Sequence, residues 1–108
     1  MDELRNDITN ILLQYLTEAQ SADMISVFSD RAMLAFKEYR NYPDSWDDDA
    51  ILADMTKHKS CIADLALYEC IQQGAEFQSM HIESGLYRMW NNKGNVFTQH
   101  RVVPFVTL

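Results

Sequence analysis

The sequence predicts a small, mainly α-helical protein, in which a three-helix body with a long third helix precedes a short β-hairpin and an extended C-terminal tail. Apolar residues recur at intervals of three and four as far as Gln73, the spacing of amphipathic helices. Glycine and proline are scarce, with 3 and 2 copies in 108 residues, which leaves little turn chemistry in the first two thirds. After Gly74, aromatic and β-branched residues stand between Gly and Asn turn signals, which favours short strands.

A chain of this length has room for one hydrophobic core. We therefore expect a single domain, with a helical body over residues 1–74 and a hairpin and docking tail over residues 75–108. The apolar fraction of 47% is normal for a globular protein. Many domains this small gain further stability by oligomerisation, so assembly is expected.

The first two predicted helices are amphipathic. The first runs from Asp2 to about Leu16 and carries acidic residues near the positive end of its dipole. The second runs from Ser21 or Ala22 to about Arg40, and Pro43 prevents its continuation. Their apolar positions are Leu4, Ile8, Ile11, Leu12, Tyr15 and Leu16 in the first, and Met24, Val27, Phe28, Ala32, Ala35, Phe36 and Tyr39 in the second.

The third predicted helix is long for so small a domain. Ser45 or Asp44 is the expected N-cap, and the run Asp47–Asp49 lies where the first-turn N–H groups favour negative charge. The same run could instead bind a metal, but it lacks the Gly and the distal Glu of a calcium loop. The helix is expected to end near Gln73, with Gly74 as its stop, at a length of about 40 Å.

The last third of the sequence has a different residue pattern. Met80–Glu83 and Leu86–Trp90 flank Ser84-Gly85 and predict the two strands of the hairpin, and Asn91–Asn95 is a second turn signal. The tail from Arg101 to Leu108 is apolar and cannot be helical across Pro104. Such a segment usually pairs with a groove or a sheet edge, in its own chain or in another.

The net charge of -7, from 16 acidic and 9 basic residues, argues against tight sequence-specific binding of nucleic acid. No window approaches the about 20 apolar residues of a membrane span, and the N-terminus does not resemble a signal peptide, so we expect a cytoplasmic protein and no membrane partner. Cys61 and Cys70 lie about 13 Å apart along one predicted helix and cannot form a disulfide with each other.

The sequence contains few residues in patterns typical of catalytic or metal sites, and we expect neither an enzyme nor a cofactor or metal site. His58 and Cys61 share a helix face and would form half of a metal site, but no second pair at ligand spacing accompanies them. P-loop, dinucleotide-binding and nucleophile-elbow motifs are absent. Trp46, and the group Tyr87, Met89 and Trp90, could bind a partner or stack on bases, but packing within the chain is the favoured interpretation.

The run His81-Ile-Glu83-Ser-Gly85-Leu-Tyr-Arg88-Met-Trp90, after Gly74-Ala-Glu76, resembles the head–tail connector family of tailed bacteriophages, also called adaptor, head completion or neck proteins. His81, Glu83, Gly85, Arg88 and Trp90 match the family's polar motif, and Val103-Pro104 matches its tail. Met80, Ile82 and Tyr87 replace serines of the family pattern, and Ser84 replaces a glycine.

The resemblance implies a structural virion protein at the head–tail interface, present in the host cytoplasm before assembly. Its partners would be further copies of itself in a ring of about twelve subunits, the portal protein, and a tail, neck or stopper protein. Double-stranded DNA would pass through the ring without sequence-specific contacts. The expected partner-binding residues are His81, Glu83, Gly85, Arg88, Trp90, Val102, Val103, Pro104, Phe105, Val106 and Leu108.

A second function class stays open. A small, acidic, helical protein of the cytoplasm could also be a regulator or inhibitor that blocks a basic partner by mimicking nucleic acid. This alternative predicts acidic residues clustered on one exposed face.

Overall fold

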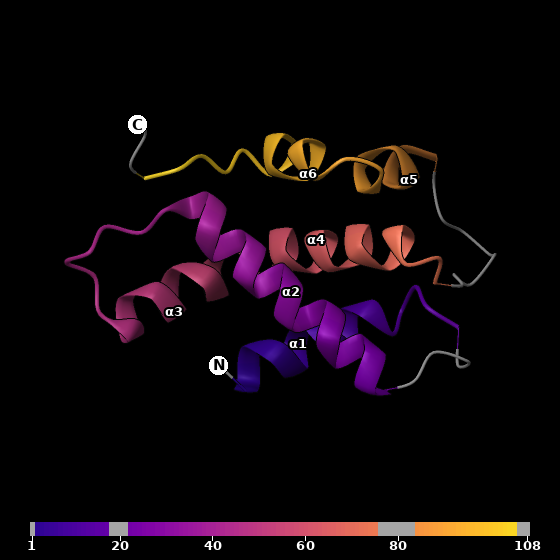
Figure 1. Ribbon diagram of the computed structural model, residues 1–108, viewed down its shortest axis with the longest axis horizontal. Coiled ribbons are helices and arrows are strands. Elements are labelled where there is room, and N and C mark those ends of the chain that lie inside the picture. The colour runs from indigo at the N-terminus through magenta and orange to yellow at the C-terminus, as the bar shows by residue number, and fades with distance from the viewer. Residues whose placement is uncertain (1, 18–21, 76–83, 106–108) are drawn as a thin grey trace.

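The computed structural model describes residues 2–17, 22–75 and 84–105, and these form helices and connecting segments without a β-strand. The helices are α1 (Asp2–Leu12), α2 (Ala22–Arg40), α3 (Asp48–Lys57), α4 (Lys59–Gln72), α5 (Ser84–Trp90) and α6 (Lys93–Gln99). Helix α4 lies between α1 on one side and α5 and α6 on the other, and α2 crosses it diagonally (Figure 1). The prediction of a mainly helical protein is confirmed.

The central helix is apolar around most of its circumference, as expected for a helix covered on several sides. Its buried residues are Cys61, Ile62, Ala63, Leu65, Ala66, Leu67 and Cys70. Side chains from α1, α2, α5 and α6 pack around it in a single cluster, which also includes Val102 of the tail. The C-terminal segment therefore shares the core of the helical body within the described part of the chain.

Two predicted helix ends are confirmed and one is wrong. Helix α2 ends at Arg40, and Asn41 follows it with a left-handed φ of 53°. At the end of α4, Gly74 has a φ of 72°, and the N–H of Ala75 donates to the carbonyl of Cys70, the pattern of a Schellman motif. Helix α1 ends at Leu12 rather than Leu16, because turns replace its last residues while Leu16 stays buried.

The predicted long third helix is wrong in its continuity, because it consists of two helices that meet at His58. The backbone of His58 leaves helical geometry, with φ −107° and ψ 26°. The periodicity hides this break, because Met55 and Ile62 lie seven residues apart, two helical turns, and are both fully buried. The acidic run does cap α3, but the capping residue is Asp47, whose carboxylate accepts from the N–H of Ala50 at 2.8 Å, and not Ser45 or Asp44.

The predicted β-hairpin is not supported, because its second strand is helical, while its first strand, residues 80–83, lies outside the described residues. Residues 84–90 form α5, and the predicted second turn contains the N-cap of α6, because the Asn92 side chain accepts from the N–H of Gly94 at 2.8 Å. Leu86, Met89 and Trp90 have the i, i+3, i+4 spacing of a helix face, and all three pack against the core. Docking on α4 thus outweighs the preference of aromatic residues for strands.

Candidate interaction surfaces

The described part of the C-terminal tail, Val102–Phe105, is fastened to the end of α2. Val102 is buried, and its carbonyl accepts from the hydroxyl of Tyr39 at 3.2 Å. The Tyr39 ring stacks on Phe97 of α6, with ring centroids 3.6 Å apart. This stretch of tail therefore binds to its own chain, one of the two arrangements that the sequence left open.

Arg40, the last residue of α2, contacts the tail at three points. Its Nη1 donates to the carbonyl of Val103 at 2.7 Å, and its own carbonyl accepts from the N–H of Phe105 at 2.8 Å. The guanidinium carbon lies 3.8 Å from the centroid of the Phe105 ring, a cation–π contact. One arginine thus contacts the backbone of Val103 and of Phe105 and also the Phe105 ring.

Asp54 of α3 fixes the orientation of this arginine. Its two carboxylate oxygens accept from Nε and Nη2 of Arg40 at 3.0 and 3.1 Å, the bidentate geometry that planar guanidinium groups favour. Tyr42 donates to the same carboxylate at 2.8 Å. Burial alone would raise the pKa of Asp54, but the hydrogen bonds from Arg40 and Tyr42 outweigh it and hold that pKa below its ordinary value. Burial lowers the pKa of the neighbouring His58.

A second carboxylate, Asp64 of α4, binds the C-terminal helices. It accepts from the indole Nε1 of Trp90 at 3.0 Å, and its other oxygen is hydrogen-bonded to Nε2 of His100. Trp90 is fully buried, and the ring of Tyr15 packs edge-on against it at 5.2 Å. Asp54 and Asp64 therefore attach the C-terminal third at two points, through Arg40 and through Trp90 and His100.

The predicted partner-binding residues separate into three groups. His81, Glu83, Val106 and Leu108 lie outside the described residues, and Gly85 is the second residue of α5. Trp90 and Val102 are buried in the core, and Pro104 is half-buried. Arg88, Val103 and Phe105 are exposed, the last two by 62% and 41%. These three side chains are the predicted contacts that a partner can reach in the described part of the fold.

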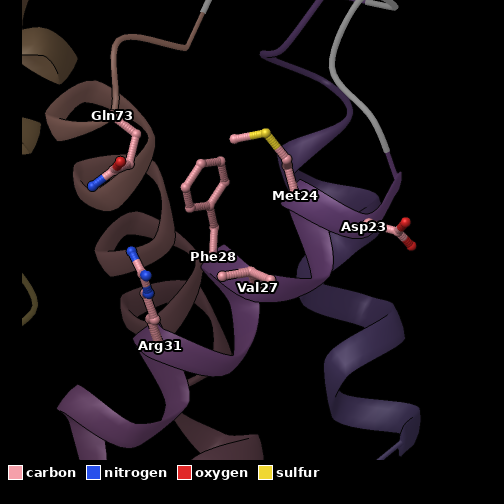
Figure 2. Close-up of a pocket in the computed structure, with 6 residues that line it drawn as sticks. All are labelled: Asp23, Met24, Val27, Phe28, Arg31 and Gln73. Atoms are coloured by element: carbon pink, nitrogen blue, oxygen red, sulfur yellow. The ribbon is translucent and has the colours of Figure 1, made fainter.

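A shallow apolar pocket that the sequence did not predict lies between α2 and the end of α4 (Figure 2). Its lining residues are Asp23, Met24, Val27, Phe28, Arg31 and Gln73. Met24 and Val27 belong to the apolar set of the predicted second helix, but they lie outside the core, at 45% and 47% exposure. The cavity of about 190 Å³ is smaller than the ~300 Å³ or more of typical small-molecule sites. It suits a side chain of a partner protein better than a cofactor.

The cysteines and histidines do not form a metal centre within the described residues, where no group of three potential ligands comes together. His58 instead lies beside Asp54, with 3.8 Å between Nε2 and the carboxylate. Cys61 and Cys70 are both free and buried.

Both thiols are expected to be unreactive in the folded protein. Burial raises the pKa of Cys61 and of Cys70 to about 12, so almost no thiolate is present at neutral pH. Labelling with a thiol-specific chromogenic disulfide should be slow in buffer and rapid in denaturant, with two thiols released per chain. Rapid labelling in buffer at a rate far above that of unfolding would contradict the burial of these helix positions.

Within the residues described, none of the helices is long and apolar enough to cross a membrane. Comparisons of the chain with protein-family models, with curated proteins and with solved structures found no match. The resemblance to head–tail connectors therefore rests on the sequence motif of residues 74–90 and on Val103-Pro104.

Proposed function

We propose that this protein is a structural adaptor of the head–tail connector type, which forms a ring below the portal of a tailed bacteriophage. The motif His81–Trp90 with the Val103-Pro104 tail is the observation that carries the proposal. A net charge of -7 agrees with it, because an acidic channel lets DNA pass without binding it. The small single core agrees with it too, since such domains gain stability in assemblies.

The end of the tail is the proposed docking element for the portal or for the next ring. Val103 and Phe105 present apolar surface there, while Arg40 fixes the backbone between them. Two exposed apolar side chains on a backbone that is already ordered lose little conformational entropy on binding. The tail would then enter a groove of the partner with Val103 and Phe105 as anchors, and the helices would form the body of the subunit.

Val103→Asp should abolish attachment to the portal and leave the fold intact. The Val103 side chain is 62% exposed and contributes its carbonyl, not its side chain, to the contact with Arg40. A carboxylate in an apolar interface is costly to desolvate, so we expect loss of at least about 90% of the ring-bound protein when variant and portal rings are mixed and imaged by negative stain. The matched control is Thr98→Asp, which places the same charge at an exposed position of α6.

The circular dichroism spectrum and unfolding midpoint of both variants should match those of the unmodified chain. Normal decoration of portal rings by Val103→Asp would exclude the tail as the docking element. Failure of the unmodified chain to bind portal rings at all would overturn the connector proposal itself.

An exposed acidic cluster supports one other function, the nucleic-acid mimic. Asp44, Asp47, Asp48 and Asp49 are all exposed around the start of α3. Replacing Asp48 and Asp49 with Asn should weaken capture of a basic partner under this alternative, and should leave portal binding unchanged under the connector proposal. Asp47 is left in place because it caps α3.

A further inference from the structure

One face of α2 carries a stripe of exposed residues at spacings of three and four. It consists of Met24, Val27, Arg31, Leu34 and Glu38, which we call the α2 stripe. Its three apolar members are 45%, 47% and 57% exposed, although Phe28, Ala32 and Phe36 of the same helix are fully buried. The 3-4-3-4 spacing is that of a helix seam that packs against another helix.

The two charged members of the α2 stripe have no ion-pair partner among the described residues. Other charged groups are paired, such as Arg5 of α1 with Asp30 of α2, at 2.7 Å. Arg31 and Glu38 are seven residues apart, about 10 Å along the axis, and this separation is too large for a mutual ion pair. The α2 stripe therefore presents one positive and one negative charge on either side of Leu34, in an apolar setting.

We propose that the α2 stripe binds the α2 stripe of a second copy of this chain in antiparallel orientation, with Leu34 near the twofold axis. In this register Arg31 of each copy faces Glu38 of the other, and two ion pairs flank the apolar centre. A parallel pair would place like charges opposite each other, and an antiparallel pair centred on Arg31 would bring the two arginines together. Charge complementarity therefore favours a second copy of this chain as the partner, and it favours this antiparallel register.

The pocket of Figure 2 forms part of the proposed interface. Met24, Val27 and Arg31 belong to the α2 stripe and also line this pocket, and in Figure 2 the Met24 and Arg31 side chains lie on either side of Phe28. In the proposed register Val27 and Met24 lie opposite the segment that follows α2 in the partner, because α2 ends at Arg40. That segment would meet a hollow surface instead of a convex one. Apolar surface covered in this way is removed from water, which favours association.

A twofold contact of this kind is independent of the connector proposal. It joins two copies and closes on itself, whereas a ring requires a second, head-to-tail contact. The inference would hold for a regulator as well as for a virion protein, and it concerns the free protein before assembly.

Charge exchange across the α2 stripe provides the test, with the mass in solution measured by sedimentation velocity over a range of concentrations. The unmodified chain should dimerise. Arg31→Glu and Glu38→Arg should each weaken the dimer about tenfold or more, because each turns two attractive pairs into two repulsive ones. The double variant R31E/E38R should restore the affinity, since it recreates both pairs with their signs exchanged.

Two further variants complete the test. Leu34→Glu should abolish the dimer, and Lys57→Glu, at an exposed position at the end of α3, should leave it unchanged with the same change in net charge as Arg31→Glu. Circular dichroism establishes that each variant is folded. A monomeric wild-type chain at all concentrations would overturn the proposal, and so would a double variant as weak as the single ones. Portal binding by a chain that does not dimerise would leave the connector proposal standing by itself.

Discussion

Replacing Trp90 with alanine is expected to destabilise the protein by about 3–5 kcal/mol, measured by urea denaturation followed by circular dichroism. The side chain of Trp90, the last residue of α5, is fully buried and packs against Tyr15, which follows α1. Its removal leaves a large cavity and also removes the indole donor to Asp64. A domain of this size has a stability of roughly 5–15 kcal/mol, so much of the population could lose its fold.

Trp90→Phe separates the effect of the cavity from the effect of the lost hydrogen bond. Phenylalanine fills most of the space, but it cannot donate to the carboxylate of Asp64, whose other hydrogen bond comes from His100. We expect a loss of about 1.5–3 kcal/mol, the cost of one hydrogen bond to a charged group. A Trp90→Ala protein as stable as the unmodified chain would mean that Trp90 is not part of the core.

Trp90 also shows how a motif residue can be structural. The resemblance to connectors suggested a contact with a partner, whereas the side chain is inaccessible in the folded chain. A loss of assembly in Trp90→Ala would therefore report on the fold and not on the interface. Val103→Asp, at an exposed position, is the better probe of docking.

The sequence was sufficient to predict elements with strong local signals. Helix α2 was predicted almost to the residue, because an acidic first turn starts it and Pro43 lies shortly after its end. Gly74 was predicted as a helix stop because a left-handed residue is needed there, and its φ of 72° is in that region. In both places a single residue type satisfies a local backbone requirement.

The secondary-structure predictions were wrong where contacts between distant parts of the chain determine the local structure. Neither Gly nor Pro marks the break at His58, and the residues beside it continue the apolar pattern. The segment from Ser84 to Gln99 combines aromatic residues with Asn and Gly, which is compatible with a hairpin or with two short helices. Only the core that α2 and α4 provide, in which Trp90, Val96 and Phe97 are buried, favours the helices over the hairpin.

The candidate surfaces were less predictable than the fold. Apolar periodicity assigned Met24 and Val27 to the apolar face, but α2 is apolar on two sides and only one side meets the core. A signal was present in the sequence, because Met24, Val27, Arg31, Leu34 and Glu38 repeat at 3-4-3-4. The fastening of the tail by Arg40 and Asp54 had no such signal, since Arg40 and Val103 are 63 residues apart.

Replacing Asp54 with alanine is expected to cost about 3 kcal/mol and to loosen the tail. The Arg40 and Asp54 side chains are only 12% and 10% exposed, so removal of the carboxylate leaves a guanidinium poorly solvated and without its bidentate partner. Tyr42 loses its acceptor in the same step. Hydrogen exchange should then accelerate at the Phe105 amide, which is bonded to the carbonyl of Arg40, while the amides of α4 become less protected only as far as global stability falls.

Asp54→Asn and Tyr42→Phe are the matched controls. Asparagine keeps the shape and can still accept hydrogen bonds, but it lacks the charge, so we expect a smaller loss than with alanine. Tyr42→Phe removes one hydrogen bond to this carboxylate and should cost about 1.5 kcal/mol. Unchanged exchange at Phe105 in Asp54→Ala would mean that Arg40 holds the tail without help from the carboxylate.

The pH dependence of stability provides an independent check on the same group. The pKa of Asp54 is lower in the folded chain than its ordinary value of 3.8, so the folded state binds its proton less readily than the unfolded state. The stabilisation is therefore complete at pH values well above 3.8 and is lost as the pH falls through the lower, folded-state pKa. The difference in unfolding free energy between the unmodified chain and Asp54→Asn should accordingly shrink as the pH falls below about 4.

Protonation of His58 should also destabilise the folded chain, and it should do so at a higher pH than protonation of Asp54. Burial lowers its pKa below the ordinary 6.5, so protonation favours the unfolded chain and stability begins to fall as the pH drops below 6.5. In a His58→Gln variant the loss near pH 6 should disappear, while the loss below pH 4 that depends on Asp54 should remain. Since both groups surround Arg40, the two steps together would identify this cluster as the acid-sensitive attachment of the tail.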